Sequence, residues 1–161
     1  MANDLKAQLA DKTGYRPPVQ PARNKILDYD VVDDAEKAIR ALQYKDKFGK
    51  PKIDLTTSQI RKFLTAVNVV RNKVDLYKAK NKNTAVLSPE LVMEIKFLKV
   101  NLLYQAGRDN SRNKIVKKFI DEARLDKIID DIGDEPKKFA KFCKYVEALV
   151  AYHKYLGGKD K

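Results

Sequence analysis

The sequence predicts an all-α protein, a compact bundle of about five helices with a poorly ordered N-terminal arm. Apolar residues recur three and four positions apart through several long segments, which is the period of a helix. The 6 glycines and 6 prolines cluster between these segments, where they end helices. No segment alternates apolar and polar residues in the manner of a strand, so we expect no sheet. The predicted domains are a flexible arm over residues 1–30 and a single helical-bundle domain over residues 31–161.

The first two helices have recognisable ends. Gly14, Pro17, Pro18 and Pro21 break any helix in the arm, so the first helix is predicted from about Val32 to Phe48, ending before Gly49 and Pro51. The second begins at Leu55-Thr56-Thr57-Ser58-Gln59-Ile60, where Thr56 and Gln59 fit a capping box and Leu55 and Ile60 a hydrophobic staple. It is expected to run to about Lys80. Its apolar face consists of Ile60, Phe63, Leu64, Val67, Val70, Val74 and Tyr77.

Three further helical stretches follow. Ser88-Pro89-Glu90 combines a serine cap, a first-turn proline and an acid. The helix that it opens, residues 91–106, is apolar around much of its circumference, so we expect it to be the central and most buried one. Asn110-Ser111 caps a stretch that breaks before Ile128 and ends by Gly133. The last helix begins near residues 134–136 and ends at Gly157-Gly158, and its buried residues are expected to be Phe139, Phe142, Cys143, Val146, Leu149 and Val150.

Composition indicates a soluble globular protein. Hydrophobic residues make up 43% of the chain and charged residues 35%, a mixture typical of amphipathic helices. The sequence has no apolar run of membrane-spanning length and no recognisable secretion signal. The single cysteine, Cys143, excludes an internal disulfide framework, so we expect the reducing cytoplasm.

The charge is both high and unevenly distributed. Lys and Arg total 34 against 22 acids, for a net charge of +12, which favours a polyanionic partner over a merely solubilised surface. Residues 44–82 carry a net +8 and residues 96–118 a net +6, whereas residues 121–135 carry −5. Uniform solubilisation would not need this segregation.

Signatures of catalysis are scarce. His153 is the only histidine, and its spacing with Val146, Leu149 and Val150 indicates a partly buried structural residue. Cys143 lies on the same apolar stripe and is predicted to be core. Gly157-Gly158-Lys159 follows a helix, which is the wrong context for a phosphate loop. We therefore expect no enzymatic activity and no cofactor. We also expect no metal site, since the acids near 126–134 lack the spacing of a calcium loop.

The helix after Thr56 offers a surface for RNA. At about 100° per residue its polar positions fall within about 80° of one another, opposite the core face. They are Ser58, Arg61, Thr65, Asn68 and Asn72, flanked by Lys62 and Lys73 on one side and Arg71 on the other. Such donors suit a phosphate–sugar backbone, and the backbone N–H groups at Thr57-Ser58-Gln59 add to them. The alternative is a polar face with no ligand.

Two weaker candidates lie further along the chain. Arg108, followed by Arg112 and Lys114, is either a second RNA contact or a charge that complements the end of a helix. Lys141, Tyr145, Tyr152 and Tyr155 share the other face of the last helix. Tyrosines among lysines can stack on bases, but they also form subunit interfaces, and we favour the interface.

Three blocks resemble a known family. They are Leu55 to Leu64 (LTTSQIRKFL), Leu98 to Arg108 (LKVNLLYQAGR) and Phe142 to Asp160 (FCKYVEALVAYHKYLGGKD). In this order they resemble the small subunit of the type III-A CRISPR effector, the Csm interference complex. The resemblance spans about residues 52–160 and has no clear counterpart for residues 1–45.

The resemblance implies a cytoplasmic, non-catalytic helical bundle that stacks in several head-to-tail copies. Its partners would be the backbone and large subunits, the crRNA that they hold, and the target RNA, whose backbone it would contact without reading sequence. RNA cleavage and nucleotide cyclisation would belong to other subunits. Matched position by position, the implied RNA contacts are Ser58, Gln59, Arg61, Lys62, Arg71 and Arg108, to which the surface patterns add Asn68 and Arg112.

Charge segregation on one chain is also compatible with head-to-tail association, and guide pairing would supply the specificity. The rival interpretation is a small basic helical DNA-binding regulator. It is disfavoured because no compact helix–turn–recognition-helix spacing is evident. A small nuclease is a third and weaker alternative.

Overall fold

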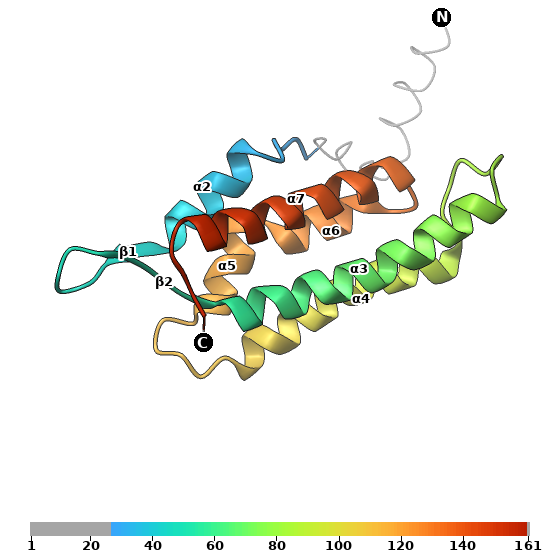
Figure 1. The fold of residues 1–161 in the computed structure, drawn as a ribbon. Coiled ribbons are helices and arrows are strands. Elements are labelled where there is room, and N and C mark those ends of the chain that lie inside the picture. The colour runs from blue at the N-terminus through green and yellow to red at the C-terminus, as the bar shows by residue number, and fades with distance from the viewer. Residues whose placement is uncertain (1–26, 161) are drawn as a thin grey trace, which may run out of the picture.

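The computed structural model describes residues 27–160, and these form a helical bundle with a small sheet at one end (Figure 1). The helices and strands follow the order α2 (Asp33–Leu42), β1 (Gln43–Lys45), β2 (Pro51–Thr56), α3 (Thr57–Lys80), α4 (Pro89–Arg108), α5 (Ile115–Ala123), α6 (Leu125–Ile132), α7 (Pro136–Tyr155) and β3 (Gly158–Lys159). Helices therefore dominate the described chain, as predicted, and none of them is long and apolar enough to cross a membrane.

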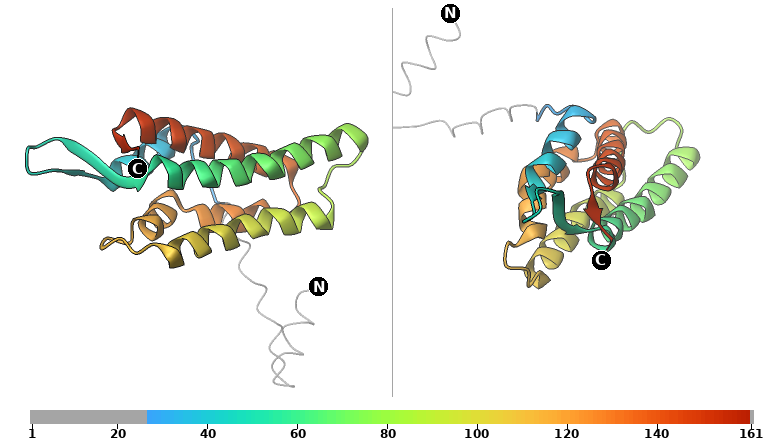
Figure 2. Two further views of the ribbon diagram at one scale, coloured as in Figure 1. Left: turned by 60° about the horizontal axis from the view of Figure 1, so that its bottom comes forward. Right: turned by 60° about the vertical axis from the view of Figure 1, so that its left-hand side comes forward.

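Helix α7 lies at the centre of the packing. It contacts α2, α3 and α6, and its buried residues include Phe139, Phe142, Tyr145 and Leu149, each at most 1% exposed. Long helices α3 and α4 lie side by side as an antiparallel pair, joined by the 81–88 loop (Figures 1 and 2). An ion pair between Lys73 and Glu94 at 2.9 Å links their surfaces.

The prediction that residues 91–106 form the most buried helix is wrong. Helix α4 buries only one face, made of Leu91, Ile95, Leu98 and Leu102. Its opposite side carries exposed apolar side chains, namely Met93, Phe97, Val100, Leu103 and Tyr104, at 51–63% exposure. An apolar circumference fits a central helix, but it also fits an outer helix whose second face is covered only by another molecule. In the monomer α4 is an outer helix, and its second face is exposed.

The absence of a sheet was also wrongly predicted. Strands pair in the order β1-β2-β3, with β1 antiparallel and β3 parallel to β2. In β2 the side chains of Ile53 and Leu55 are buried between more exposed neighbours, so a short alternating pattern was present but spans too few residues to distinguish from a loop. As a result the first helix ends at Leu42, six residues before the predicted Phe48, and the chain continues as a hairpin.

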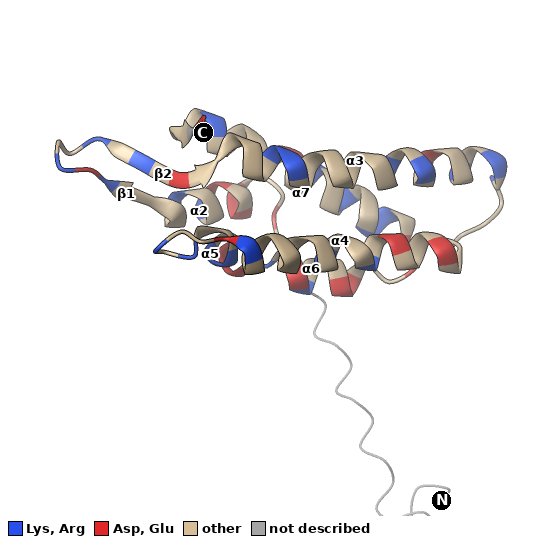
Figure 3. Cartoon of the chain, turned by 90° about the horizontal axis from the view of Figure 1, so that it is seen from below, with Lys and Arg blue, Asp and Glu red and all other residues tan. Residues whose placement is uncertain are grey.

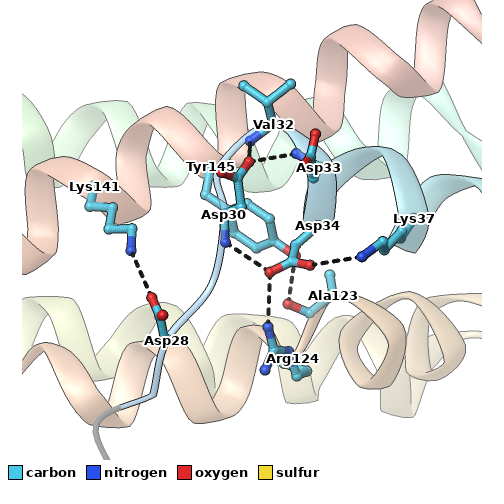
Figure 4. Close-up of polar contacts among 10 residues, drawn as sticks. All are labelled: Asp28, Asp30, Val32, Asp33, Asp34, Lys37, Ala123, Arg124, Lys141 and Tyr145. Atoms are coloured by element: carbon cyan, nitrogen blue, oxygen red, sulfur yellow. Dashed lines mark hydrogen bonds and ion pairs between the residues drawn. The ribbon is translucent and has the colours of Figure 1, made fainter.

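The described chain begins at residue 27, just before the predicted start of the bundle domain. Most of the predicted arm, residues 1–30, lies outside the described residues, but residues 27–30 are folded. The ring of Tyr29 is 8% exposed, and its centroid lies 5.0 Å from that of Tyr145. Asp30 Oδ1 accepts hydrogen bonds from the backbone N–H groups of Val32 and Asp33, and so caps α2 (Figure 4). Flexibility of the preceding residues remains a prediction.

Asp34 strengthens this corner of the bundle. Its carboxylate accepts a hydrogen bond from the N–H of Asp30 at 2.8 Å and pairs with Arg124 at 3.3 Å (Figure 4). Arg124 sits between α5 and α6 with φ of +54°, at the break that the sequence placed before Ile128. The contact therefore ties α2 to the α5–α6 junction.

Candidate nucleic-acid interface

The start of α3 is fixed by the predicted capping box. The hydroxyl of Thr56 accepts a hydrogen bond from the N–H of Gln59 at 3.2 Å, and Gln59 Oε1 accepts one from the N–H of Thr56 at 2.9 Å. Because this reciprocal pair holds the first turn, Ser58 is presented on the exposed side. The side-chain carbonyl of Gln59 is engaged in the capping box, which leaves its side-chain nitrogen Nε2 available as a donor.

A cleft forms where the start of α3 meets the end of α4. It has a volume of about 180 Å³ and is lined by Gln59, Lys62, Gln105, Arg108, Asp109 and Val116. Lys62 and Arg108 are both exposed. The fold thus brings two cations and two side-chain amides together from separate segments, a set of donors suited to phosphate and sugar oxygens.

The side chain of Arg108, which lines this cleft, is oriented by a neighbouring aromatic ring. The centre of its guanidinium lies 5.5 Å from the ring centroid of Tyr104, one turn earlier on α4, within the range of a cation–π contact. This contact restricts the arginine side chain while leaving its N–H donors at the surface. A sequence motif could not have shown it, although the one-turn spacing permits it.

Asp109 organises the loop beside the cleft. Its carboxylate, 7% exposed, accepts hydrogen bonds from the N–H groups of Ser111 at 2.9 Å and Val116 at 3.0 Å. Burial disfavours its charge, but the hydrogen bonds from Ser111 and Val116 outweigh burial and hold the pKa of Asp109 below its usual value. Asp109 therefore caps α5 together with Ser111, whose hydroxyl accepts the N–H of Ile115.

Of the two side chains that cap α5 from the 109–114 loop, the sequence predicted one. Ser111 was predicted as a cap, whereas Asp109 was missed, even though an acid two residues before a serine favours such a turn. Arg112 lies on the 109–114 loop and is exposed, but it does not line the cleft.

The predicted strip along α3 is open to solvent. Ser58, Arg61 and Asn68 are all exposed, and Arg61 makes no ion pair with any described residue. Val69 and Leu76, 51% and 62% exposed, interrupt the polar character of the helix further along. The polar surface is consequently most continuous over the first half of α3.

Arg71 is placed differently from the other predicted contacts. Its guanidinium donates a hydrogen bond to Glu147 Oε1 on α7 at 2.6 Å, and the side chain is partly exposed at 39%. This ion pair raises the pKa of Arg71 and directs the side chain toward α7. Arg71 thus lies apart from the cleft that contains Lys62 and Arg108.

The tyrosine face of α7 is only partly a surface. Tyr145 is 1% exposed and donates its hydroxyl hydrogen to the carbonyl of Ala123 at 3.0 Å, so its inclusion in an interface was wrong. Lys141 lies over the ring of Tyr29, 4.2 Å from its centroid. Tyr155 is 80% exposed and stays a candidate contact.

Residues singled out as structural are buried as predicted. His153 is 1% and Cys143 is 2% exposed, and burial raises the pKa of the Cys143 thiol to about 11, which disfavours a reactive thiolate. Gly158 belongs to strand β3 and faces the His153 ring. Among residues 27–160 no group of three or more His, Cys, Asp or Glu is arranged to hold a metal ion.

Charge is segregated among the elements of the fold, with both signs present at each end of the bundle (Figure 3). Basic residues occur on the hairpin, on α3 and at the loop after α4, whereas acids gather on α6 and at the opposite end of α4 (Figure 3). Several of these acids are paired within the chain, as Asp130 is with Lys99 at 2.7 Å. The cleft therefore lies beside basic elements, the hairpin and the start of α3.

Comparison with known proteins gives a consistent result. Residues 35–159 match the model of a family described as Csm2 Type III-A. Proteins named CRISPR system Cms protein Csm2 are similar to the chain: one from Streptococcus thermophilus is 37% identical over 135 residues, and one from Mycobacterium tuberculosis strain H37Rv is 34% identical over 136. Each alignment covers 84% of this chain and 98% of the relative. A third, from Enterococcus italicus, is 36% identical over 69% of this chain and 77% of its own.

Proposed function

Because this chain belongs to the Csm2 type III-A family of CRISPR proteins, we propose that it is a non-catalytic subunit of a type III-A CRISPR ribonucleoprotein that contacts RNA backbone without reading sequence. The observation that carries the RNA contact is the cleft, in which Lys62 from α3 meets Arg108 from α4. Two cations fixed on separate helices suit successive phosphates. Base pairing with a guide would supply specificity.

The open strip of α3 extends this surface. Ser58, Arg61 and Asn68 continue from the cleft along the exposed side of the helix. Helix α3 follows strand β2 directly, so its basic start lacks the preceding helix of a helix–turn–helix. This arrangement favours RNA contact over the DNA-binding regulator.

The exposed apolar side of α4 supports a subunit role. Met93, Phe97, Val100 and Tyr104 are spaced by four, three and four residues, so they share one face. A contiguous exposed apolar face marks a surface that another protein covers. The partners that fit this proposal are the backbone and large subunits that carry the crRNA and target RNA, and further copies of this chain.

Head-to-tail association of copies is supported by the charge distribution. The hairpin and the cleft are basic, whereas acids gather on α6 and on the first half of α4, beside which the last turn of α3 carries Lys78 and Lys80 (Figure 3). Unlike surfaces on one chain permit heterologous contacts, which form open filaments instead of closed dimers.

The test is the salt dependence of RNA binding. We expect the purified full chain to bind a fluorescein-labelled, unstructured RNA 12-mer weakly, with log K falling steeply as log salt rises. The double variant Lys62→Ala, Arg108→Ala should reduce that slope by about two, equally for RNAs of different sequence.

A matched control removes two charges elsewhere. Lys78 and Lys80 lie in the last turn of α3, away from the cleft, and Lys78→Ala, Lys80→Ala changes the net charge by the same amount. If the slope of log K against log salt were equal for the two double variants, RNA would be held by the general positive charge of the protein, and the cleft would not be the site.

A further inference from the structure

The hairpin of β1 and β2 projects beyond the helices (Figures 1 and 2). Phe48, in the turn between the strands, is 75% exposed and lies outside the hydrophobic core. The ammonium of Lys47 lies 5.0 Å from the centroid of its ring. An exposed phenylalanine at a protruding tip adds no apolar burial to the described fold, which makes it a candidate contact for a ligand.

The turn holds this tip in one conformation. Asp46 Oδ1 accepts hydrogen bonds from the N–H groups of Phe48 at 2.8 Å and Lys50 at 2.9 Å. The N–H of Gly49 donates to the Asp46 carbonyl at 2.9 Å, and the φ of +76° at Gly49 suits glycine. A tip ordered in advance loses little conformational freedom when it binds a partner.

The same contacts leave the tip basic. The only acid in the turn is Asp46, whose side chain is 11% exposed and pairs with Lys52 at 3.3 Å. The hydrogen bond from the Lys50 N–H, together with the Phe48 N–H and Lys52, lowers the pKa of Asp46 despite its desolvation. Because this carboxylate is largely covered and paired, the exposed charged residues next to Phe48 are Lys47 and Lys50.

The hairpin is joined to the end of the bundle that contains the cleft. Strand β2 leads directly into α3, and Asp54 on β2 accepts hydrogen bonds from Asn113 Nδ2 at 3.2 Å and from the Tyr44 hydroxyl at 2.9 Å. Asn113 belongs to the loop that Asp109 organises. At about 3.3 Å per residue, the six residues of β2 place the turn roughly 17–20 Å beyond the start of α3.

We propose that the hairpin tip is a second contact for the RNA strand whose backbone crosses the cleft, with the Phe48 ring stacked on a base and Lys47 and Lys50 beside the adjacent phosphates. This inference rests on the proposed function. Aromatic rings among cations are the usual platform for single-stranded nucleic acid, and stacking accepts any base. The cores of protein interfaces, in contrast, are depleted in lysine, so a protein groove is the less favoured occupant.

The experiment compares Phe48→Ala with the parent chain on two labelled 12-mers of equal charge. One is oligoadenylate, and the other has the same backbone with abasic sugars. We expect Phe48→Ala to weaken binding of oligoadenylate at least fivefold with no change in salt slope, because no charge is removed. Binding of the abasic strand should stay the same, and Phe48→Tyr should retain binding of both.

The outcomes separate this inference from the proposed function. If Lys62→Ala, Arg108→Ala weakens binding of both strands but Phe48→Ala affects neither, the hairpin inference is overturned and the cleft stands. If no variant affects either strand, both fail. If Phe48→Ala spares RNA binding but reduces self-association in sedimentation velocity, the tip is a protein contact. Unchanged thermal unfolding would establish that Phe48→Ala folds.

Discussion

The imidazole Nε2 of His153, near the end of α7, lies 2.6 Å from the carbonyl oxygen of Leu55 in β2. His153 is 1% exposed, and Gly158 of β3 packs directly against its ring. The His153 side chain therefore connects α7 to strands β2 and β3, next to the start of α3. Since that start forms one side of the cleft, the surroundings of His153 bear on stability and on the candidate site alike.

Stability should depend on pH through His153. Burial, opposed by the Leu55 hydrogen bond, lowers the pKa of His153 below its usual value of 6.5, so the unfolded chain takes up a proton at a higher pH than the folded chain does. The contribution of neutral His153 to the free energy of unfolding is full above pH 6.5. It is lost as pH falls toward the pKa of the folded state, at no more than about 1.4 kcal/mol per pH unit. Urea unfolding between pH 7.5 and 5.5 measures this loss.

The control uses the fact that His153 is the only histidine in the chain. His153→Gln should be less stable at neutral pH but should show a flatter pH profile over the same interval. A profile as steep as that of the parent would place the titration on other groups.

Gly158 should not tolerate a side chain. A Cβ added there would clash with the His153 ring, which is 1% exposed and is held by the carbonyl of Leu55. We expect Gly158→Ala to lower the free energy of unfolding by about 1–3 kcal/mol, a typical cost of overpacking. Thermal unfolding monitored by circular dichroism measures it.

Gly107 provides the matched control for Gly158. It lies in the last turn of α4, and an added Cβ meets nothing within 4 Å. Gly107→Ala should be neutral or stabilising by up to about 1 kcal/mol, because alanine favours a helix over glycine. A similar loss of stability in both variants would argue against the contact with His153.

Arg61 and Arg71 should differ in RNA binding although both lie on α3. Arg61 is exposed and makes no ion pair with any described residue, so Arg61→Ala should reduce the salt slope of binding by about one. Arg71 is engaged by Glu147 at 2.6 Å, so Arg71→Ala should leave the slope unchanged. Fluorescence anisotropy with one RNA at several salt concentrations measures both, and reversed behaviour would remove Arg61 from the surface.

Local signals in the sequence predicted the helices well where a cap or a breaker defined an end. The capping box at Thr56 and Gln59 located the start of α3, and Ser88 located that of α4, where its hydroxyl accepts the N–H of Leu91. The hairpin was missed because its strands are short and are stabilised by Asp46 in the turn and by pairing with β3, some 100 residues later.

The site was predictable by residue but not by arrangement. Lys62 and Arg108 were both named from the sequence, yet their meeting in one cleft follows from the antiparallel packing of α3 and α4. The ion pair of Arg71 with Glu147 is likewise a tertiary contact, 76 residues apart. Helical spacing places side chains on a face, but it does not say which of the faces another helix covers.

The outer face of α4 gives the last prediction. Phe97 is 55% exposed, whereas Leu98, the next residue, is 2% exposed, so adjacent positions test opposite sides of one helix. Phe97→Ser should change the free energy of unfolding of the isolated chain by no more than about 0.5 kcal/mol, as for other surface substitutions. Leu98→Ala should lower it by about 2–5 kcal/mol, because it leaves a cavity in the core.

Assembly should show a different dependence on Phe97. If another subunit covers this face, Phe97→Ser removes apolar burial from that contact and leaves a polar group there. Quantitative mass spectrometry of complexes purified from the native host through a tag on this chain should then show fewer partner subunits for Phe97→Ser than for the parent, at equal abundance of the tagged chain. Full recovery of partners with Phe97→Ser would mean that the face stays in solvent, and the exposed stripe on α4 would lose its role as an interface.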